Sequence, residues 1–170
     1  MKLTIWKTTY RLLTEQKTPF SKLSIRAICE ACAIHHTSFY YHFNDKFDLF
    51  NFGIQQLLAD YERLSIQTKF TSPFSVSNTF FKNSDLQLLI TAQTHDPLAP
   101  SLITRYAEKQ LVTEAFLYLE NKTISVPQQL LAQQLVRTIF TISDWSQTQA
   151  HISDTELDVL YQELTANLFI

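Results

Sequence analysis

The chain has one glycine among its 170 residues, and five prolines. β-Hairpins usually turn on glycine, so a chain this poor in it has little turn chemistry for a sheet. The single glycine also excludes the Gly-rich loops that cradle phosphates, and neither G-x-S-x-G nor H-E-x-x-H occurs. We therefore predict an all-α protein that is not an enzyme.

Long apolar runs are missing as well. No stretch of about 18 apolar residues occurs, so no membrane span is expected. The N-terminus, MKLTIWKTTYR, is interrupted by charges and lacks the apolar run of a signal peptide. Cys29 and Cys32 stand three residues apart and do not make a secreted disulfide framework. These absences predict a cytoplasmic protein with no membrane partner.

The stretch from Leu23 to Phe50 predicts two short helices joined by a tight turn, then the start of a third. Ser24 suits the cap of the first helix, and the turn falls near Ala33-Ile34. The second helix is expected from about His35 to Tyr41, and Asp45 suits the cap of the third. This order and these lengths are typical of a DNA-binding helix-turn-helix.

The same stretch carries a motif. Its elements are Ile28-Cys29, Ile34, Ser38-Phe39-Tyr40-Tyr41-His42-Phe43, Asp45-Lys46 and Leu49. With them the first 50 or so residues resemble the N-terminal domain of the TetR family of bacterial transcriptional regulators. The resemblance implies a three-helix DNA-binding domain over residues 1–46 and a helical ligand-binding and dimerisation domain over residues 47–170. The residues after the motif carry no pattern that we can match.

By this resemblance, the second helix of the motif lies in the major groove. The residues it implies at the DNA are Ser24, Arg26, His36, Thr37, Ser38, Tyr40, Tyr41, His42 and Lys46. At the first turn of the next helix, the ammonium of Lys46 and the exposed N–H groups are expected to bind one phosphate. Two departures stand out. Ala33 occupies a position where the family often has glycine, and His35 one where a capping serine is usual. The recognition helix also has no Arg or Lys for the commonest guanine contact.

Other interpretations of these residues stay open. Tyr40 suits the core about as well as DNA, and His42 suits a local structural hydrogen bond about as well as a phosphate. Cys29-x-x-Cys32 followed by His35-His36 resembles a run of zinc ligands. However, the two cysteines lie on the predicted apolar face, and four ligands within eight residues leave no second arm to clamp a metal. We therefore expect no metal and no cofactor.

Charge is distributed unevenly along the chain. Residues 1–50 carry seven Lys or Arg against four Asp or Glu, an excess of three positive charges, and three histidines besides. Residues 51–170 carry seven Lys or Arg against twelve Asp or Glu. A basic head on an acidic body suits a protein that meets phosphates at one end. Double-stranded DNA is the expected partner.

Apolar periodicity predicts the remaining helices. They are expected over residues 3–16 with Leu3, Trp6, Tyr10 and Leu13 on one face, from Lys46 to about Leu64, near 74–81, from Asp85 to about Thr94, from after Pro97 to near Asn121-Lys122, from Pro127 to about Ser146, and from Ser153-Asp154 onward. His95-Asp96-Pro97 should break the chain, because a residue before proline avoids the α region.

The last two helices are the predicted dimer interface. The helix beginning at Pro127 has apolar residues on two faces, so one face can cover its own body and the other a second copy. The predicted interface residues are Leu131, Leu135, Ile142, Trp145, Leu157, Leu160, Tyr161, Leu164 and Leu168. The alternative is that both helices are ordinary monomer core. A homodimer would place two recognition helices about 34 Å apart on a roughly palindromic site.

The body is expected to bind a small-molecule effector between its helices. The candidate pocket residues are Tyr61, Phe81, Tyr106 and Phe116, although such aromatics more often fill a core. The predicted function is a repressor that the effector releases from DNA. The alternatives are an interaction protein on the same fold, which lacks specific DNA binding and acts through a partner regulator, and a ligand carrier without a DNA function.

Overall fold

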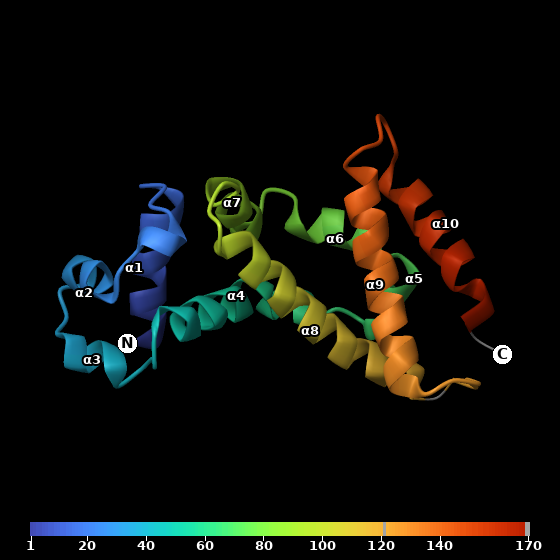
Figure 1. The fold of residues 1–170 in the computed structure, drawn as a ribbon, viewed down its shortest axis with the longest axis horizontal. Helices are drawn as coiled ribbons and strands as arrows, with labels where there is room; N and C mark the ends of the chain where they lie inside the picture. Colours follow the sequence, from blue (N-terminus) through green and yellow to red (C-terminus); the bar gives the residue numbers. More distant parts are fainter. Residues whose placement is uncertain (121, 169–170) are drawn as a thin grey trace. The chain divides into compact units, whose positions relative to one another are not determined.

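The computed structural model describes residues 1–120 and 122–168, and every regular element among them is helical (Figure 1). The α-helices are α1 (Lys2–Thr14), α2 (Ile25–Cys32), α3 (His36–Tyr40), α4 (Lys46–Glu62), α5 (Ile66–Thr71), α6 (Pro73–Phe81), α7 (Asp85–Ala92), α8 (Ala99–Leu119), α9 (Gln128–Ser146) and α10 (Asp154–Thr165). Two 3-10 helices, η1 (Phe20–Lys22) and η2 (Ala166–Leu168), complete the set. The all-α prediction is confirmed.

The chain forms two compact units. The first combines Met1–Glu62 with Asn83–Tyr106, and the second combines Arg63–Lys82 with Ala107–Ile170. These units divide the chain elsewhere than at the boundary we expected after residue 46, because α4, α7 and the start of α8 pack with the N-terminal helices. In the part of the chain described, no helix is both long and apolar enough to cross a membrane.

The single glycine lets α1 and α4 pack closely in the first unit. α1 buries Ile5, Trp6 and Leu13. A Cβ placed on Gly53 of α4 would lie only 2.2 Å from Cζ3 of Trp6, so the indole occupies the space that any other side chain would need. Leu3, which we expected on the buried face, is instead 45% exposed, because that face is centred on Ile5 and its neighbours.

Gln93, just after α7, connects the end of α1 to the segment that leads into η1. The side chain is buried, and its Oε1 accepts a hydrogen bond from the backbone N of Phe20 at 2.9 Å. Its Nε2 donates to the carbonyl oxygens of Leu13 at 2.8 Å and Thr18 at 3.0 Å. One amide group thus satisfies three backbone groups that no regular helix pairs.

Asp96, three residues after Gln93, also accepts hydrogen bonds from unpaired backbone groups. Its Oδ2 accepts from the backbone N of Ser21 at 2.8 Å, and its Oδ1 accepts from Leu98 N at 2.9 Å and Ala99 N at 2.8 Å at the start of α8. Burial would raise the pKa of this carboxyl, but the hydrogen bonds from Ser21, Ala99 and Leu98 outweigh it and hold the pKa below its usual value. As predicted, α7 ends before Pro97.

The second unit has its own core, in which α9 and α10 contribute one apolar face each. Leu131, Leu135 and Ile142 of α9 are at most 4% exposed, and Leu157 and Tyr161 of α10 at most 6%. These five residues were predicted to face a second copy, and that prediction is corrected here. The periodicity identified the apolar face, but their own chain covers it.

Four residues of the predicted interface remain accessible. Trp145 is 45% exposed and Leu164 is 64% exposed, while Leu160 and Leu168 are half-buried. The outward face of α9 is otherwise mostly polar, with Arg137 among its exposed residues. Any surface available to a partner on these helices is therefore narrower than expected.

α5 was not predicted, and it contributes a buried ion pair. The ammonium of Lys69 lies 2.7 Å from Oε1 of Glu114 on α8, and the two side chains are 0% and 9% exposed. The other carboxylate oxygen of Glu114, Oε2, is buried and has no hydrogen-bond partner among the described residues. A buried pair of this kind is costly to break, because removing one partner leaves the other charge uncompensated.

Two helix starts in the second unit are held by carboxylates. Asp158 of α10 is buried and accepts from the backbone N of Phe74 at 2.8 Å and of Ser75 at 3.2 Å, the unpaired donors at the start of α6. Ser153 and Glu156 form a reciprocal capping box at the start of α10. The predicted start of that helix is confirmed. α8 ends at Leu119, and Asn121, near which we expected its end, lies outside the described residues.

Candidate nucleic-acid interface

Local chemistry fixes the angle between α2 and α3. The Ser24 hydroxyl accepts from the backbone N of Ala27 at 3.1 Å, which is the predicted N-cap. At the other end of α2, Ala33 has φ 53° and ψ 45°, the left-handed conformation that glycine usually adopts at helix ends of this type. The backbone N of Ile34 then donates to the carbonyl of Cys29 at 3.0 Å and closes the turn.

α3 is short, and its aromatic side chains hold it in place. Phe39 is fully buried and Phe43 is 2% exposed, with their ring centroids 5.8 Å apart. Phe43 in turn packs against Phe52 of α4 at 5.5 Å. The buried side of α3 is therefore fixed, and its other side is free to carry polar groups.

α4 begins as predicted. Oδ1 of Asp45 accepts from the backbone N of Asp48 at 2.8 Å, and Oδ2 of Asp48 accepts from the backbone N of Asn44 at 3.0 Å. The two carboxylates satisfy donors at the positive end of the helix. One donor of the first turn, the Asp48 N–H, is therefore already paired.

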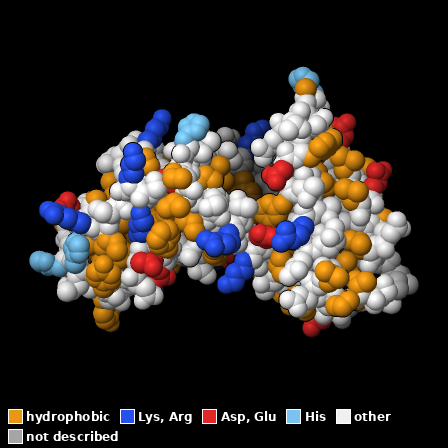
Figure 2. Space-filling view, viewed as in Figure 1, with side chains coloured by type: hydrophobic (Ala, Val, Ile, Leu, Met, Phe, Trp, Pro, Cys, Tyr) orange, Lys and Arg blue, Asp and Glu red, His pale blue; other side chains and the backbone are white. Residues whose placement is uncertain are grey.

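The predicted DNA-contacting residues differ in exposure. Exposed side chains are Ser24, Arg26, His36, Thr37, Tyr40 and Tyr41, and half-buried ones are Ser38, His42 and Lys46. Tyr40 is 54% exposed and Tyr41 is 85% exposed, so neither is a core aromatic. In the face shown in Figure 2, Lys, Arg and His side chains gather over α1 to α3. The recognition surface thus combines hydroxyls, imidazoles and phenols.

Comparison with known proteins identifies this domain. A family model described as "Bacterial regulatory proteins, tetR family" matches residues 5–51, which span α1 to the start of α4. The chain therefore carries a tetR-family DNA-binding domain. The resemblance seen in the motif is confirmed over these residues, and a domain of this kind supports a role in transcriptional regulation.

The fold of the whole chain has a counterpart among solved structures. The crystal structure of the reduced form of NemR from E. coli is similar to it with a TM-score of 0.55. The match covers 99% of this chain and 97% of that one at 15% sequence identity, which shows a shared fold. No curated protein matches the chain by sequence.

Arg26 of the tetR-type head lies on the exposed side of α2. Its Nε lies 2.8 Å from Oε1 of Glu30, one turn along the same helix, and the side chains are 79% and 64% exposed. An exposed pair of this kind is weak, because water screens it. The guanidinium can therefore leave Glu30 for a stronger anion such as a phosphate.

Lys46 does not have the place we expected. Its ammonium donates to the carbonyl oxygens of Phe20, Ser21 and Leu23, each at 3.0 Å, so all three of its N–H donors are used. Burial lowers the pKa of Lys46, and the charge of Asp96 partly opposes this. The side chain holds η1 against α4 and supports the start of α2. In this structure it is a positioning residue, and the predicted phosphate contact would require its ammonium to leave these carbonyl groups.

The cysteines and histidines of the head do not form a metal site in the part of the chain described. Cys29 is buried and Cys32 is half-buried, and no group of three or more His, Cys, Asp or Glu there could hold a metal ion. Burial raises the pKa of both thiols. Both cysteines behave as small apolar residues under α2.

Two residues near α3 were missed by sequence reasoning. Lys2, exposed at the start of α1, places its ammonium 5.4 Å from the ring centre of Phe43, directly after α3. His35 is exposed and lines a groove of about 450 Å³ together with His36 and Arg26. The positive charge of Lys2 is visible in the sequence and would suit a phosphate contact. That Lys2 lies near α3 follows only from the packing of α1, which the sequence does not show.

The four predicted effector-pocket residues have different surroundings. Tyr61 is 9% exposed, and Tyr106 places its hydroxyl 3.5 Å from Oε1 of Glu62. Phe81 is half-buried and Phe116 is 38% exposed. None of these four residues lines the hollow between Phe70 and Tyr161 or the one between Leu64 and Phe80 in the second unit.

Proposed function

We propose that the protein is a transcriptional repressor that binds a roughly palindromic operator as a homodimer and leaves it when a small-molecule effector binds. The observation that carries the proposal is the surface of α3. Phe39 anchors the helix in the core while His36, Thr37 and Tyr40 project from it, in a domain of the tetR family. A short rigid helix with polar side chains outward is what the major groove accepts.

The residues of α3 divide into two roles in this proposal. His36, Thr37 and Ser38, in the first turn, are nearest the base edges, where hydroxyls bond to several bases and the Thr37 methyl suits the methyl group of thymine. Tyr40 and Tyr41 extend towards the phosphates, which their hydroxyls can contact as donors. Arg26, His42 and Ser24 add contacts to the backbone of the same site.

The homodimer is proposed on the apolar side chains that the chain leaves uncovered. Trp145 is exposed near the end of α9, and Leu164 is exposed in the last turn of α10, one turn from the half-buried Leu160 and Leu168. Large exposed apolar groups on neighbouring helices favour association with another surface. A two-fold dimer carries two identical heads, which suits two half-sites about 34 Å apart on DNA.

Helix α8 supports the proposed effector response. It begins at Ala99, where Asp96 ties its first turn to the head, and continues unbroken to Leu119 in the core of the second unit. An effector that binds better to one arrangement of α8 shifts the population of heads able to fit DNA. Its effect on operator affinity equals its differential affinity for the two states.

Binding of the purified protein to the DNA upstream of its own gene tests the proposal. A scrambled duplex of the same length is compared at two salt concentrations. Phosphate contacts alone lose affinity with salt equally for both duplexes, whereas base readout leaves a gap of about 1,000-fold or more. Loss of that gap at both salt concentrations contradicts an autoregulating repressor.

Single substitutions then locate the contact surface. Tyr40→Phe and Tyr41→Phe remove one hydroxyl each and should weaken operator binding by about three- to tenfold through the lost hydrogen bond. Tyr106→Phe is the matched control, because its hydroxyl faces Glu62 rather than the head surface. Equal affinity for all three variants would remove the tyrosines from the interface.

A second function is favoured by one observation. α3 has no Arg or Lys, and Lys46, the nearest cation after it, is engaged by three carbonyl groups. A head of this kind suits a regulator that acts by pairing with another regulator. Equal and weak binding to both duplexes, with an intact dimer, would favour this alternative.

A further inference from the structure

The second unit has a partly open cavity of about 200 Å³ between α5, α8, α9 and α10. Phe70 and Tyr118 form one wall, with their rings stacked at 5.1 Å between centroids and 27° between planes. Leu135 adds an apolar side. The remaining lining residues are Thr71, Tyr161, Gln162, Thr165 and Ala166, so no charged side chain lines the cavity.

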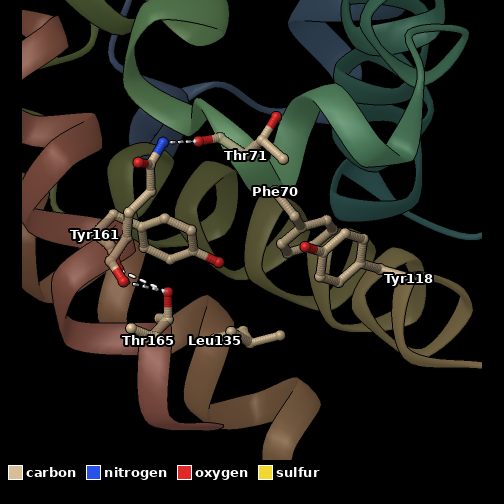
Figure 3. A pocket seen from close by; sticks show the side chains of 8 residues that line it. Phe70, Thr71, Tyr118, Leu135, Tyr161 and Thr165 are labelled. Atoms are coloured by element: carbon tan, nitrogen blue, oxygen red, sulfur yellow. Dashed lines mark hydrogen bonds between the residues drawn. The ribbon is translucent and has the colours of Figure 1, made fainter. Parts of the chain in front are cut away.

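One polar atom in the cavity lacks a partner. Tyr161 is 1% exposed, and its hydroxyl is buried with no hydrogen-bond partner among the described residues. Figure 3 shows its ring directed across the cavity towards Phe70 and Tyr118. An unsatisfied buried hydroxyl costs stability, so a fold that keeps one usually has something to place against it.

Two other polar side chains of the lining are already engaged. Nε2 of Gln162 donates to the carbonyl of Thr71 at 2.9 Å, which joins α10 to the end of α5 beside the cavity (Figure 3). The Thr165 hydroxyl donates to the carbonyl of Tyr161 at 2.7 Å. The phenol O–H of Tyr161 is therefore a buried donor at the cavity with no partner among the described residues.

We propose that this cavity is the effector site and that it takes a small uncharged aromatic molecule whose single hydrogen-bond acceptor receives the Tyr161 hydroxyl. The size fits one substituted ring, because an apolar cavity of about 150 Å³ already holds benzene. The stacked wall offers a face to a flat ring. A charged ligand is excluded, because no lining side chain would compensate its charge.

The inference deepens the proposed function and depends on it only for the regulatory outcome. Ligand binding itself is a property of the second unit and can be measured on the full chain without DNA. Since α8 carries Tyr118 at the cavity and continues to the Asp96 contact, occupancy of the cavity acts on the helix that the head is tied to.

Three probes of similar shape test the chemistry. Acetophenone has one ring and one carbonyl acceptor, cumene is the hydrocarbon of the same shape, and benzoate is the charged relative. Their dissociation constants are measured on the full chain by ligand-observed NMR. We expect acetophenone to bind about three- to tenfold more tightly than cumene, as one added hydrogen bond allows, and benzoate not to bind.

Substitutions locate the binding. Tyr161→Phe should remove the preference for acetophenone over cumene while leaving cumene binding unchanged. Leu135→Phe should fill the cavity and weaken both neutral probes, with the thermal midpoint showing that the variant is folded. Tyr41→Phe is the matched control, because this hydroxyl is on the head surface and should have no effect on any probe.

The outcomes separate the site from the regulation. If neither neutral probe binds the wild type, or if benzoate binds best, the site assignment is overturned. If both neutral probes bind equally in wild type and Tyr161→Phe, the role of the hydroxyl is overturned. The wild type without probe is assayed on the operator in parallel, so failure of DNA binding with intact probe binding removes the repressor function and leaves the site standing.

Discussion

Ala33 holds a left-handed conformation that alanine disfavours, with φ 53° at the turn between α2 and α3. Ala33→Gly should relieve this strain and raise the free energy of unfolding by about 0.5–1 kcal/mol. Ala31→Gly, two residues earlier inside α2, is the matched control and should lower it by a similar amount. Urea unfolding measures both. A stabilising effect at both positions would contradict the argument.

At Gly53, in contrast to Ala33, the native residue is the one that fits, because the absence of a side chain leaves room for the Trp6 ring. Gly53→Ala places a methyl group 2.2 Å from the Trp6 ring, and the overpacking should destabilise the protein by about 1–3 kcal/mol despite alanine's better helix propensity. The double variant Gly53→Ala with Trp6→Leu should recover part of the loss. Thermal unfolding followed by circular dichroism provides the comparison, and additive losses would argue against direct contact.

Residue types alone predicted several local features of the head and missed others. Ser24 and Asp45 could be identified as caps because capping depends on neighbours three residues away. The contacts of Lys46 could not be predicted, because its three acceptors are main-chain carbonyls more than 20 residues earlier. Every residue carries such a carbonyl, so the sequence does not single them out. A cation near a recognition helix looks the same in sequence whether it faces a phosphate or its own backbone.

At the scale of elements, the junction between α7 and α8 holds the head together. A carboxyl whose pKa is lower in the folded protein than in the unfolded chain contributes stability above the unfolded pKa, and loses it as the pH falls through the folded pKa. Asp96 is such a group. We therefore expect this contribution to be complete at neutral pH and to disappear at a pH below about 3.9, the ordinary value for Asp.

Asp96→Asn tests that contribution. The variant should lose about 1–3 kcal/mol at neutral pH, because hydrogen bonds to a charged acceptor are replaced by weaker ones. Its stability should then fall less on acidification than that of the wild type. Urea unfolding across the acid range measures both effects, with Asp144→Asn on the exposed side of α9 as control at neutral pH. Parallel acid profiles for wild type and Asp96→Asn would contradict the assignment.

The ion pair between α5 and α8 gives a second prediction at this scale. Glu114→Leu alone should destabilise the protein by about 3–5 kcal/mol, because it leaves the Lys69 ammonium buried without its carboxylate. The double variant Lys69→Met with Glu114→Leu should recover most of the loss. Chemical unfolding of the single and double variants measures the coupling. Arg137→Ala, which breaks an exposed pair with Glu108, is the control and should change little.

Long helices could be predicted and short ones could not. The predicted start of the last helix agrees with the start of α10, because Ser153 and Glu156 form a capping box that can be recognised in the sequence. α5 was missed because its six residues are shorter than two helical turns and its first residue has no side-chain cap. Such a helix is stabilised by contacts of Phe70 and Lys69 with distant residues, which a local pattern does not contain.

For the whole molecule, assembly is the main question. In the proposed homodimer Leu164, 64% exposed on α10, is covered by the second copy. Leu164→Glu should therefore convert the dimer to monomer in sedimentation velocity and weaken operator binding through loss of the second head. Leu117→Glu, at an exposed leucine of α8, is the control and should leave the dimer intact. A dimer that survives Leu164→Glu would move the interface elsewhere.

Sequence periodicity could not decide between core and interface in this region. Leu131 and Leu164 both fall on an apolar stripe, yet one is 1% exposed and the other 64%. Periodicity reports which face of a helix is apolar, and it is silent on whether the cover comes from the same chain or another. The same limit applies to the cavity, since Phe70, Tyr118 and Tyr161 come from three helices spread over more than 90 residues.

The hydrogen bonds of Gln93 and Asp96 also bear on how the gene product is made and how it can be recombined. Both groups lie more than 40 residues beyond the matched family domain, yet they complete the backbone pairing at η1. As the chain leaves the ribosome, the first three helices must wait for residues 83–106 before the head is finished. A hybrid regulator that exchanges heads should for the same reason carry residues 83–106 along with residues 1–62.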